Sequence, residues 1–233
     1  MLLDVRRVTA GYGKVAVLHE VDLAVAAGEC VAILGANNAG KSTLLRVISG
    51  LMPARGGQVL FEAHDITADS AAERVSRGLV QVPEGRHVFA DLTVEENLLL
   101  GGLRLGTGTS RRAKLVTMYD TFPLLLSMRL RQAGTLSGGE QQLVVIARGL
   151  MAEPKILLLD EPSLGLSPIA IDRVLDVLLA IRKTGTTMVV VEQNVQLCFD
   201  LCSRGYVLRQ GRVVIADSMD RLSAEELRRA YFV

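Results

Sequence analysis

Residues 35–42 run Gly-Ala-Asn-Asn-Ala-Gly-Lys-Ser, and this spacing of glycine, lysine and hydroxyl suits the binding of a polyphosphate. Glycine lets backbone N–H groups curl round phosphate oxygens, at a helix N-terminus whose dipole favours anions. Lys41 would reach the β- and γ-phosphates, and the Ser42 hydroxyl would be a ligand of Mg²⁺. The alternative is a glycine-rich turn between a strand and a helix that binds nothing. The nucleotide-binding residues predicted from this run are Gly35, Ala36, Asn37, Asn38, Ala39, Gly40, Lys41, Ser42 and Thr43.

Two carboxylates, Asp160 and Glu161, directly follow the apolar run Ile156–Leu159. Such a run is typical of a strand buried on both faces, and ligands bind where such strands end in a parallel sheet. Asp160 would lie beside the metal, and Glu161 would lie beside the attacking water. Many strands end in acids, so the pattern alone is weak. Together with the phosphate loop it indicates a nucleoside triphosphatase.

The elements that must position these residues follow from hydrophobic periodicity. The expected strands are Leu3–Val8, Val21–Val25, Cys30–Leu34, Gln58–Phe61, Lys155–Asp160, Thr187–Val191, Tyr206–Leu208 and Val213–Ile215, and the expected helices are 42–49, 169–182 and 223–230. Residues 84 to about 152 are leucine-rich with helical spacing, and 106–112 is expected to be a solvated, basic loop. The alternation of strands and helices predicts an α/β fold with a mainly parallel sheet, a short antiparallel start and a helical insertion.

Composition excludes several classes of protein. The chain has 233 residues, 49% hydrophobic and 22% charged, which are ordinary globular values rather than those of disordered or fibrous chains. A net charge of +1 lacks the basic footprint of a dedicated nucleic-acid binder. No run approaches the ~18 apolar residues of a membrane span. Charged residues precede any apolar run at the N-terminus, and the three cysteines lack metal-like pairing, so we expect no secretory signal and a reducing, cytosolic compartment.

Residues 136–140 read Leu-Ser-Gly-Gly-Glu, in which Ser137 and Glu140 have the spacing of a capping box and Gly138 and Gly139 would expose N–H groups at a helix start. A simple helix cap is the alternative. The sequence here resembles the ABC ATPase family, whose signature motif is this pentapeptide. The resemblance implies that Ser137, Gly138, Gly139 and Glu140 face the γ-phosphate of a nucleotide bound to another subunit.

The resemblance covers essentially the whole chain and implies a P-loop (RecA-like) core with an N-terminal antiparallel β subdomain and an inserted α-helical subdomain. Residues 1–233 would form a single ABC ATPase domain, with about 84–152 as the helical subdomain. Tyr12 stands where the family places an aromatic residue that stacks on adenine; the alternative is an ordinary tyrosine at a strand end. Asn38 replaces a usual glycine, and asparagine is the residue that best tolerates left-handed angles after glycine.

Three further departures from the family pattern concern the catalytic region. Glu84 stands where most members carry a glutamine that senses Mg²⁺ and the membrane partner, which makes it a candidate metal residue. Gln193 stands where most carry a switch histidine, and with Glu161 it is a candidate catalytic residue. Ser167 replaces a usual aspartate.

Residues 82–86, 161–166 and 191–194 look like those of an ATPase subunit of branched-chain amino-acid importers. The resemblance implies a peripheral ATP-hydrolysing motor on the cytoplasmic face of the inner (plasma) membrane. Its partners would be transmembrane permease subunits, a second ATPase subunit (a copy or a paralogue) and, indirectly, a solute-binding protein, with no nucleic acid. Phe89 and Leu92 lie on a segment that docks a permease helix in the family; a purely internal hydrophobic staple is the alternative.

Other functions are weaker alternatives. Importers of urea, amides or aromatic acids would share these motifs. ABC ATPases that act on DNA carry a long coiled coil or a zinc module between phosphate loop and signature, and this chain has neither heptads nor paired cysteines there. A nucleotide sensor without turnover would explain Gln193 and Ser167, but the intact pair Asp160 and Glu161 argues against it.

Overall fold

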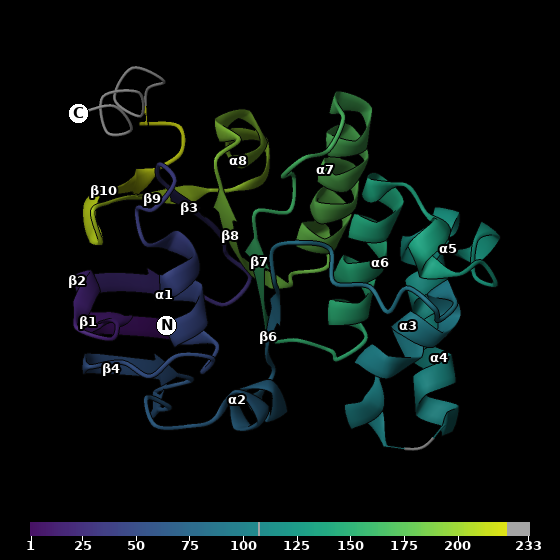
Figure 1. Ribbon diagram of the computed structural model, residues 1–233, viewed down its shortest axis with the longest axis horizontal. Coiled ribbons are helices and arrows are strands. Elements are labelled where there is room, and N and C mark those ends of the chain that lie inside the picture. Colours follow the sequence, from purple (N-terminus) through teal and green to yellow (C-terminus); the bar gives the residue numbers. More distant parts are fainter. Residues whose placement is uncertain (107, 223–233) are drawn as a thin grey trace.

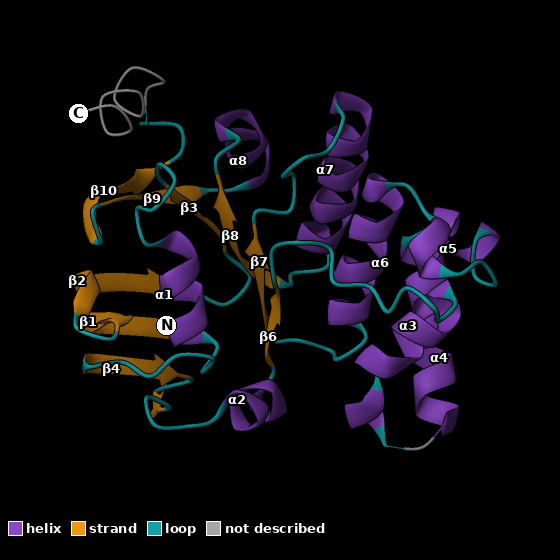
Figure 2. Cartoon of the chain, in the orientation of Figure 1, coloured by secondary structure: helices purple, strands orange, loops and turns teal. Residues whose placement is uncertain are grey.

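The computed structural model describes residues 1–106 and 108–222, which form two β-sheets and a group of helices (Figure 1, Figure 2). The helix predicted at 223–230 lies outside these residues. The strands are β1 (Leu3–Tyr12), β2 (Val15–Val25), β3 (Cys30–Leu34), β4 (Gly56–Phe61), β5 (His64–Asp65), β6 (Leu79–Val82), β7 (Ile156–Asp160), β8 (Thr187–Glu192), β9 (Arg204–Arg209) and β10 (Arg212–Ser218). The helices are α1 (Lys41–Ile48), α2 (Ala71–Arg77), α3 (Val94–Gly101), α4 (Gly108–Thr121), α5 (Pro123–Ser127), α6 (Gly138–Leu150), α7 (Pro168–Lys183) and α8 (Val195–Leu201), with short 3-10 turns at Leu103–Leu105 and Ala133–Thr135.

The larger sheet is mainly parallel, which confirms the predicted fold class. Within the described residues its order is β10-β9-β3-β8-β7-β6, and only β10 runs antiparallel to its neighbour. Strands β3, β7 and β8 are buried along their whole length, which explains their continuous apolar sequences. Leu34 pairs with Glu192, and Asp160 pairs with Val191. Because of this register, the loops that follow β3, β7 and β8 leave the sheet at the same edge.

The smaller sheet is antiparallel, in the order β2-β1-β4-β5, as the sequence predicts for the start of the chain. Leu3, Val5 and Val8 are all buried, although the step from Val5 to Val8 breaks the alternation of a regular strand. A bulge between these two residues, where Arg7 has a φ of 47°, brings Val8 back to the core side. This sheet lies beside α1, on the far side of the molecule from α3–α6 (Figure 1).

Two hydrophobic clusters cover the two faces of the parallel sheet. Along β3, Val31 and Ile33 pack with residues of β1, β2 and α1, whereas Ala32 and Leu34 pack with residues of α6, α7 and α8. The same alternation divides the side chains of β7 and β8 between the clusters. Buried strands of this kind are rigid, and they hold the loops at the sheet edge in fixed positions.

Helices α3–α6 lie together at the end of the molecule opposite the antiparallel sheet, where the sequence predicts an inserted helical part (Figure 2). Thr93 begins α3 and Ser137 begins α6, each within a capping box, as predicted. No helix of residues 1–106 and 108–222 is long and apolar enough to cross a membrane.

The prediction of a solvated loop at 106–112 is wrong for most of that segment, because α4 begins at Gly108. Leu115 and Met118 of α4 are buried in the helical cluster. The packing of the turns that contain Leu115 and Met118 stabilises α4. The helix therefore extends toward its N-terminus through residues that would not form a helix alone.

Candidate active site

The predicted phosphate loop connects β3 to α1 in a tight curl. Gly35 cannot carry a side chain, because a Cβ atom there would lie 2.3 Å from the carbonyl oxygen of Leu208 in β9. Gly40 begins α1 with a φ of 105°, and Asn38 has a φ of 65°. Asn38, which replaces a usual glycine, therefore adopts the left-handed conformation that asparagine tolerates well.

Lys41 projects from the first turn of α1 and is only 4% exposed. Its ammonium donates hydrogen bonds to the carbonyl oxygens of Gly35 at 2.8 Å and Ala36 at 3.1 Å. It also lies 3.4 Å from Oε1 of Glu161. A buried cation must be paired, and Lys41 finds all three acceptors on the loops that follow β3 and β7.

Ser42 and Asp160 meet between the phosphate loop and β7, since Oγ of Ser42 donates a hydrogen bond to Oδ1 of Asp160 at 3.1 Å. Asp160 is 5% exposed. Burial raises the pKa of Asp160 to about 6, and the negative charges of Glu84 and Glu161 add to this shift. A hydroxyl and a buried carboxylate repelled by its neighbours are oxygen ligands of the kind that Mg²⁺ takes.

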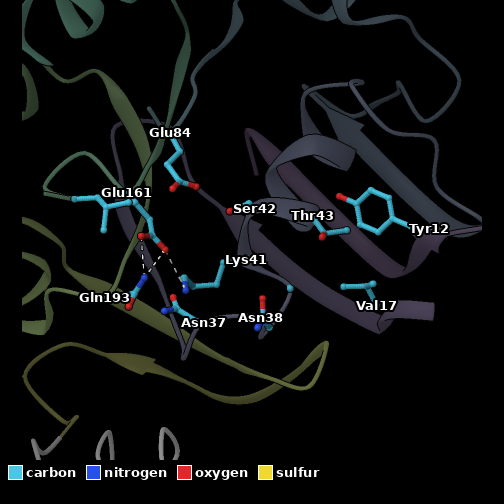
Figure 3. Close-up of a pocket in the computed structure, with 12 residues that line it drawn as sticks. Tyr12, Val17, Asn37, Asn38, Lys41, Ser42, Thr43, Glu84, Glu161 and Gln193 are labelled. Carbon is cyan, nitrogen blue, oxygen red and sulfur yellow. Dashed lines mark hydrogen bonds and ion pairs between the residues drawn. The ribbon is translucent and has the colours of Figure 1, made fainter. Parts of the chain in front are cut away.

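Among the residues that the structure describes, Glu84 does not complete a metal site together with other carboxylates. No three His, Cys, Asp or Glu side chains in the described part of the chain converge on one metal position. Mg²⁺ is usually held by one or two carboxylates together with substrate phosphates, so Ser42 and Asp160 form a sufficient protein contribution. Glu84 is exposed and lines the same pocket, facing the region of Ser42 (Figure 3).

Glu161 and Gln193, the two predicted catalytic residues, are in direct contact (Figure 3). Nε2 of Gln193 donates to both carboxylate oxygens of Glu161, at 2.9 and 2.8 Å. Glu161 has a φ of 46°, a left-handed conformation that costs a non-glycine residue about 1–3 kcal/mol and is concentrated at functional sites. The loops after β7 and β8 thus present one acid, oriented by an amide and by Lys41.

Tyr12 lies at the opposite end of the pocket from Gln193 (Figure 3). Its ring is half-exposed, and its hydroxyl accepts a hydrogen bond from Nη1 of Arg46 at 3.0 Å. Hydrogen bonds with Thr43 and then with Arg46 lower the pKa of Tyr12. This arrangement leaves the ring face at the pocket mouth, where a base can stack on it.

The pocket has a volume of about 530 Å³ and brings together part of the phosphate loop, Glu161 and the aromatic residue, whereas Gly35, Ala36, Ala39 and Asp160 do not line it. Its lining residues are Tyr12, Val17, Asn37, Asn38, Gly40, Lys41, Ser42, Thr43, Glu84, Glu161, Leu164 and Gln193. Sequence reasoning missed Val17 and Leu164. Leu164 follows the acid pair closely enough to have been considered, whereas Val17 carries no signal of its own within a strand.

The signature residues are not brought to this pocket. Ser137, Gly138, Gly139 and Glu140 line a separate pocket of about 390 Å³, together with Arg86, Ser167 and Arg173 among others. Ser137 accepts a hydrogen bond from the backbone of Glu140, whose carboxylate in turn accepts from the backbone of Ser137 at 2.7 Å. The two pockets share no lining residue, although Leu164 of the first and Gly165 of the second are consecutive.

Comparison with known proteins agrees with this geometry. Residues 18–164 match the family model described as ABC transporter. The high-affinity branched-chain amino acid transport ATP-binding protein BraG of Pseudomonas aeruginosa is 41% identical over 93% of this chain and 93% of its own length. The probable branched-chain amino acid transport ATP-binding protein LivF of Archaeoglobus fulgidus is 34% identical over 97% of this chain and 95% of its own length.

A solved structure extends the comparison to three dimensions. The dimeric post-hydrolysis state of an ATP-binding cassette bound to ADP and Pi has a TM-score of 0.79 and 26% identity, covering 93% of this chain and 98% of that one. The sequence match and the shared fold lead to one conclusion: the chain belongs to the ABC transporter family and is one of its nucleotide-binding ATPases.

Proposed function

We propose that this protein is the ATP-hydrolysing motor subunit of an importer of branched-chain amino acids. The observation that carries the hydrolytic part is the meeting of Lys41, Glu161 and Gln193 at one pocket, where the lining residue Ser42 is hydrogen-bonded to Asp160. Support for the solute class comes from the two relatives described as branched-chain amino acid transport ATP-binding proteins. Importers of urea, amides or aromatic acids remain the alternative.

The predicted site residues have distinct parts in the proposed reaction. Tyr12 stacks on adenine, and the backbone N–H groups of the phosphate loop surround the phosphates. Ser42 and Asp160, with Glu84 nearby, would hold Mg²⁺, which would supply positive charge to neutralise charge that develops on the phosphates. Lys41 exchanges its carbonyl partners for phosphate oxygens, because a charged acceptor forms the stronger hydrogen bond.

Glu161 is the general base in this proposal. A carboxylate can take the proton of the attacking water, whereas the amide of Gln193 cannot. Gln193 instead fixes the orientation of the carboxylate through its two hydrogen bonds of 2.9 and 2.8 Å. Glu161 therefore accepts the proton, and Gln193 positions Glu161.

The separation of the two pockets favours a pair of subunits. If the signature residues act on a nucleotide, that nucleotide cannot be bound by the same chain, since the phosphate loop lies in another pocket. Two chains arranged head-to-tail would sandwich two nucleotides, and the similar cassette with ADP and Pi is dimeric. We expect the specific ATPase activity to rise steeply with protein concentration; a constant value across the range where sedimentation shows monomer and dimer exchanging would contradict the pairing.

The membrane side of the proposal concerns the segment after Glu84. Phe89 is 51% exposed although it is aromatic, and it lies outside both pockets. We propose that this residue contacts a permease subunit and that the protein is peripheral on the cytoplasmic face of the membrane. A solute-binding protein would contact the permease only.

The proposed function is tested by uptake in cells that lack the gene. Complementation with the wild-type gene is expected to restore uptake of radiolabelled leucine, isoleucine and valine, and Glu161→Gln is expected to restore none. Urea, a short amide and benzoate are measured in parallel. Restoration of one of these without branched-chain amino acids would transfer the assignment to that solute, and restoration of none would contradict the importer.

A further inference from the structure

Glu192, the last residue of β8, is a buried acid to which the proposed reaction gives no role. It is 2% exposed. Within the described residues it forms no ion pair with Lys, Arg or His. Burial of a carboxylate is costly unless hydrogen bonds replace the lost water, so its partners reveal what the acid does.

Among the residues that the structure describes, the Glu192 side chain accepts hydrogen bonds from backbone N–H groups only. Oε1 accepts from the N–H of Ser163 at 2.8 Å. Oε2 accepts from the N–H of Gln193 at 2.9 Å and from that of Asn194 at 3.1 Å. One oxygen therefore binds the loop that follows β7, and the other binds the loop that follows β8.

These are the two loops that carry Glu161 and Gln193. Ser163 lies two residues after Glu161, and Gln193 donates to Glu161 with its side chain while donating to Glu192 with its backbone. The contact between Glu161 and Gln193 on the pocket side is thus matched by a second link between the same loops on the buried side. The loop after β8 is anchored further by Asn194, the N-cap residue of α8. Its Oδ1 accepts a hydrogen bond from the backbone N–H of Leu197.

The loop after β7 needs such a link. Glu161 has a φ of 46°, and its strained turn is closed by hydrogen bonds from its N–H to Val191 at 2.9 Å and from the N–H of Leu164 to its carbonyl oxygen at 3.1 Å. A strained conformation persists only where the surroundings hold it. The carboxylate of Glu192 supplies an acceptor at the centre of this turn.

We propose that Glu192 is a positioning residue for hydrolysis, which sets the separation of the two active-site loops and so holds the Glu161–Gln193 pair in register. The proposal rests on the assignment of Glu161 as the base. A carboxylate is required because both oxygens must accept. Glutamine at this position has one acceptor oxygen, and its NH₂ group would face an N–H of one loop and leave that donor without a partner.

The test compares Glu192→Gln with the wild type in the full-length protein. We expect nucleotide affinity, measured by equilibrium binding of a fluorescent ATP analogue, to change less than about twofold. We expect kcat to fall about 10- to 100-fold, the scale for a displacement of about 1 Å of a reacting group. Hydrogen exchange should accelerate at 161–164 and 193–195, while β3 and β7 remain protected.

A double-mutant cycle distinguishes positioning from general destabilisation. In a Gln193→Ala background the pair is already broken, so Glu192→Gln should lower kcat by less than about threefold more. An equal loss in both backgrounds, or a loss that follows nucleotide affinity, would overturn the proposal. Should Glu192→Gln not fold, Glu192→Asp keeps two acceptor oxygens on a shorter side chain and enters the same cycle with the same expected non-additivity.

Glu29→Gln is the control. Glu29 also accepts a backbone N–H, that of Ala26 at 2.8 Å, but it is ion-paired with Arg204 at 2.8 Å and lies at the opposite end of the same sheet, before β3. It should lower stability without changing kcat. Near-normal turnover by Glu161→Gln would contradict the proposed base itself, whereas an inactive Glu161→Gln with a fully active Glu192→Gln would overturn only the role of Glu192.

Discussion

The guanidinium of Arg86 lies against the backbone of Gly138, at such short range that a Cβ atom on Gly138 would be 2.2 Å from Nη1 of Arg86. Arg86 also donates hydrogen bonds to the carbonyl oxygens of Leu164 and Gly165, both at 2.9 Å. One side chain therefore joins the segment after β6, the start of α6 and the loop after the acid pair. Glycine at 138 leaves room for this contact.

Gly138→Ala is expected to displace the flexible end of Arg86 and so release its two hydrogen bonds. Arg86→Ala removes the same bonds, and each change should lower the free energy of unfolding by about 1 kcal/mol. The double variant should be no less stable than either single variant, because both act on one contact. Urea unfolding of the three variants measures this; additive losses would show that Gly138 and Arg86 act separately.

Glu161→Gln and Asp160→Asn should have different effects although the residues are adjacent. Glu161→Gln removes the base, so it should bind ATP normally, accumulate an ATP-bound dimer and lose on the order of 10²–10⁴ in single-turnover rate. Asp160→Asn should instead weaken binding of Mg·ATP. Gln193→Ala is measured alongside. Near-normal turnover by Glu161→Gln together with an inactive Gln193→Ala would transfer the main catalytic role to Gln193.

Phe89→Ala should separate ATP turnover from transport. The side chain is half-exposed and lines neither pocket, so nucleotide affinity should be unchanged, and loss of the contact between its ring and Arg148 should cost at most about 1 kcal/mol of stability. Uptake by vesicles that contain the permease subunits should fall, because an apolar contact of the docking surface is lost. Leu103→Ala is a suitable control, since Leu103 is similarly exposed on the 3-10 turn after α3. Equal uptake by both variants would contradict a docking role for Phe89.

The raised pKa of Asp160 predicts a specific pH dependence of stability. The pKa is about 6 in the folded protein against an ordinary value of 3.8, because of burial and then of the charges of Glu84 and Glu161. The folded state therefore binds more protons between about pH 4 and 6. The contribution of this proton to the free energy of unfolding is complete below about pH 4. It is lost as the pH rises through 6, by up to about 3 kcal/mol.

This dependence is measured by urea unfolding of the protein free of nucleotide and Mg²⁺, between pH 4.5 and 7.5. Asp160→Asn should remove most of the slope, since asparagine does not titrate. An unchanged slope in Asp160→Asn would assign the effect to other carboxylates.

Much of the fold and site could be predicted from the sequence because the signals are local. The apolar runs of β3, β7 and β8 identify buried strands, and the predicted site residues Lys41, Glu161 and Gln193, which follow them, line one pocket. The capping boxes at Thr93 and Ser137 identify two helix starts. In each case neighbouring residues contain the whole signal.

Contacts between distant segments could not be predicted in this way. Nothing in the sequence near Glu192 indicates that it accepts from Ser163, because that bond depends on the pairing of β7 with β8. Arg86 likewise reaches the loop after β7 across a large sequence separation. The helical start of α4 was hidden for the same reason, since its support comes from packing rather than from its own polar residues. The single-domain organisation of residues 1–233 and the metal role of Glu84 stay predictions.

In the proposed head-to-tail pair, each nucleotide needs the phosphate loop of one chain and the signature residues of the other, which line separate pockets, so two chains with different defects should together form one intact site. Lys41→Ala damages the phosphate side of a site, and Ser137→Arg damages the signature side. A head-to-tail pair with one chain of each kind has both lesions in one site and none in the other. Random mixing gives about half mixed pairs, so an equal mixture of two inactive proteins should regain roughly a quarter of the intact sites.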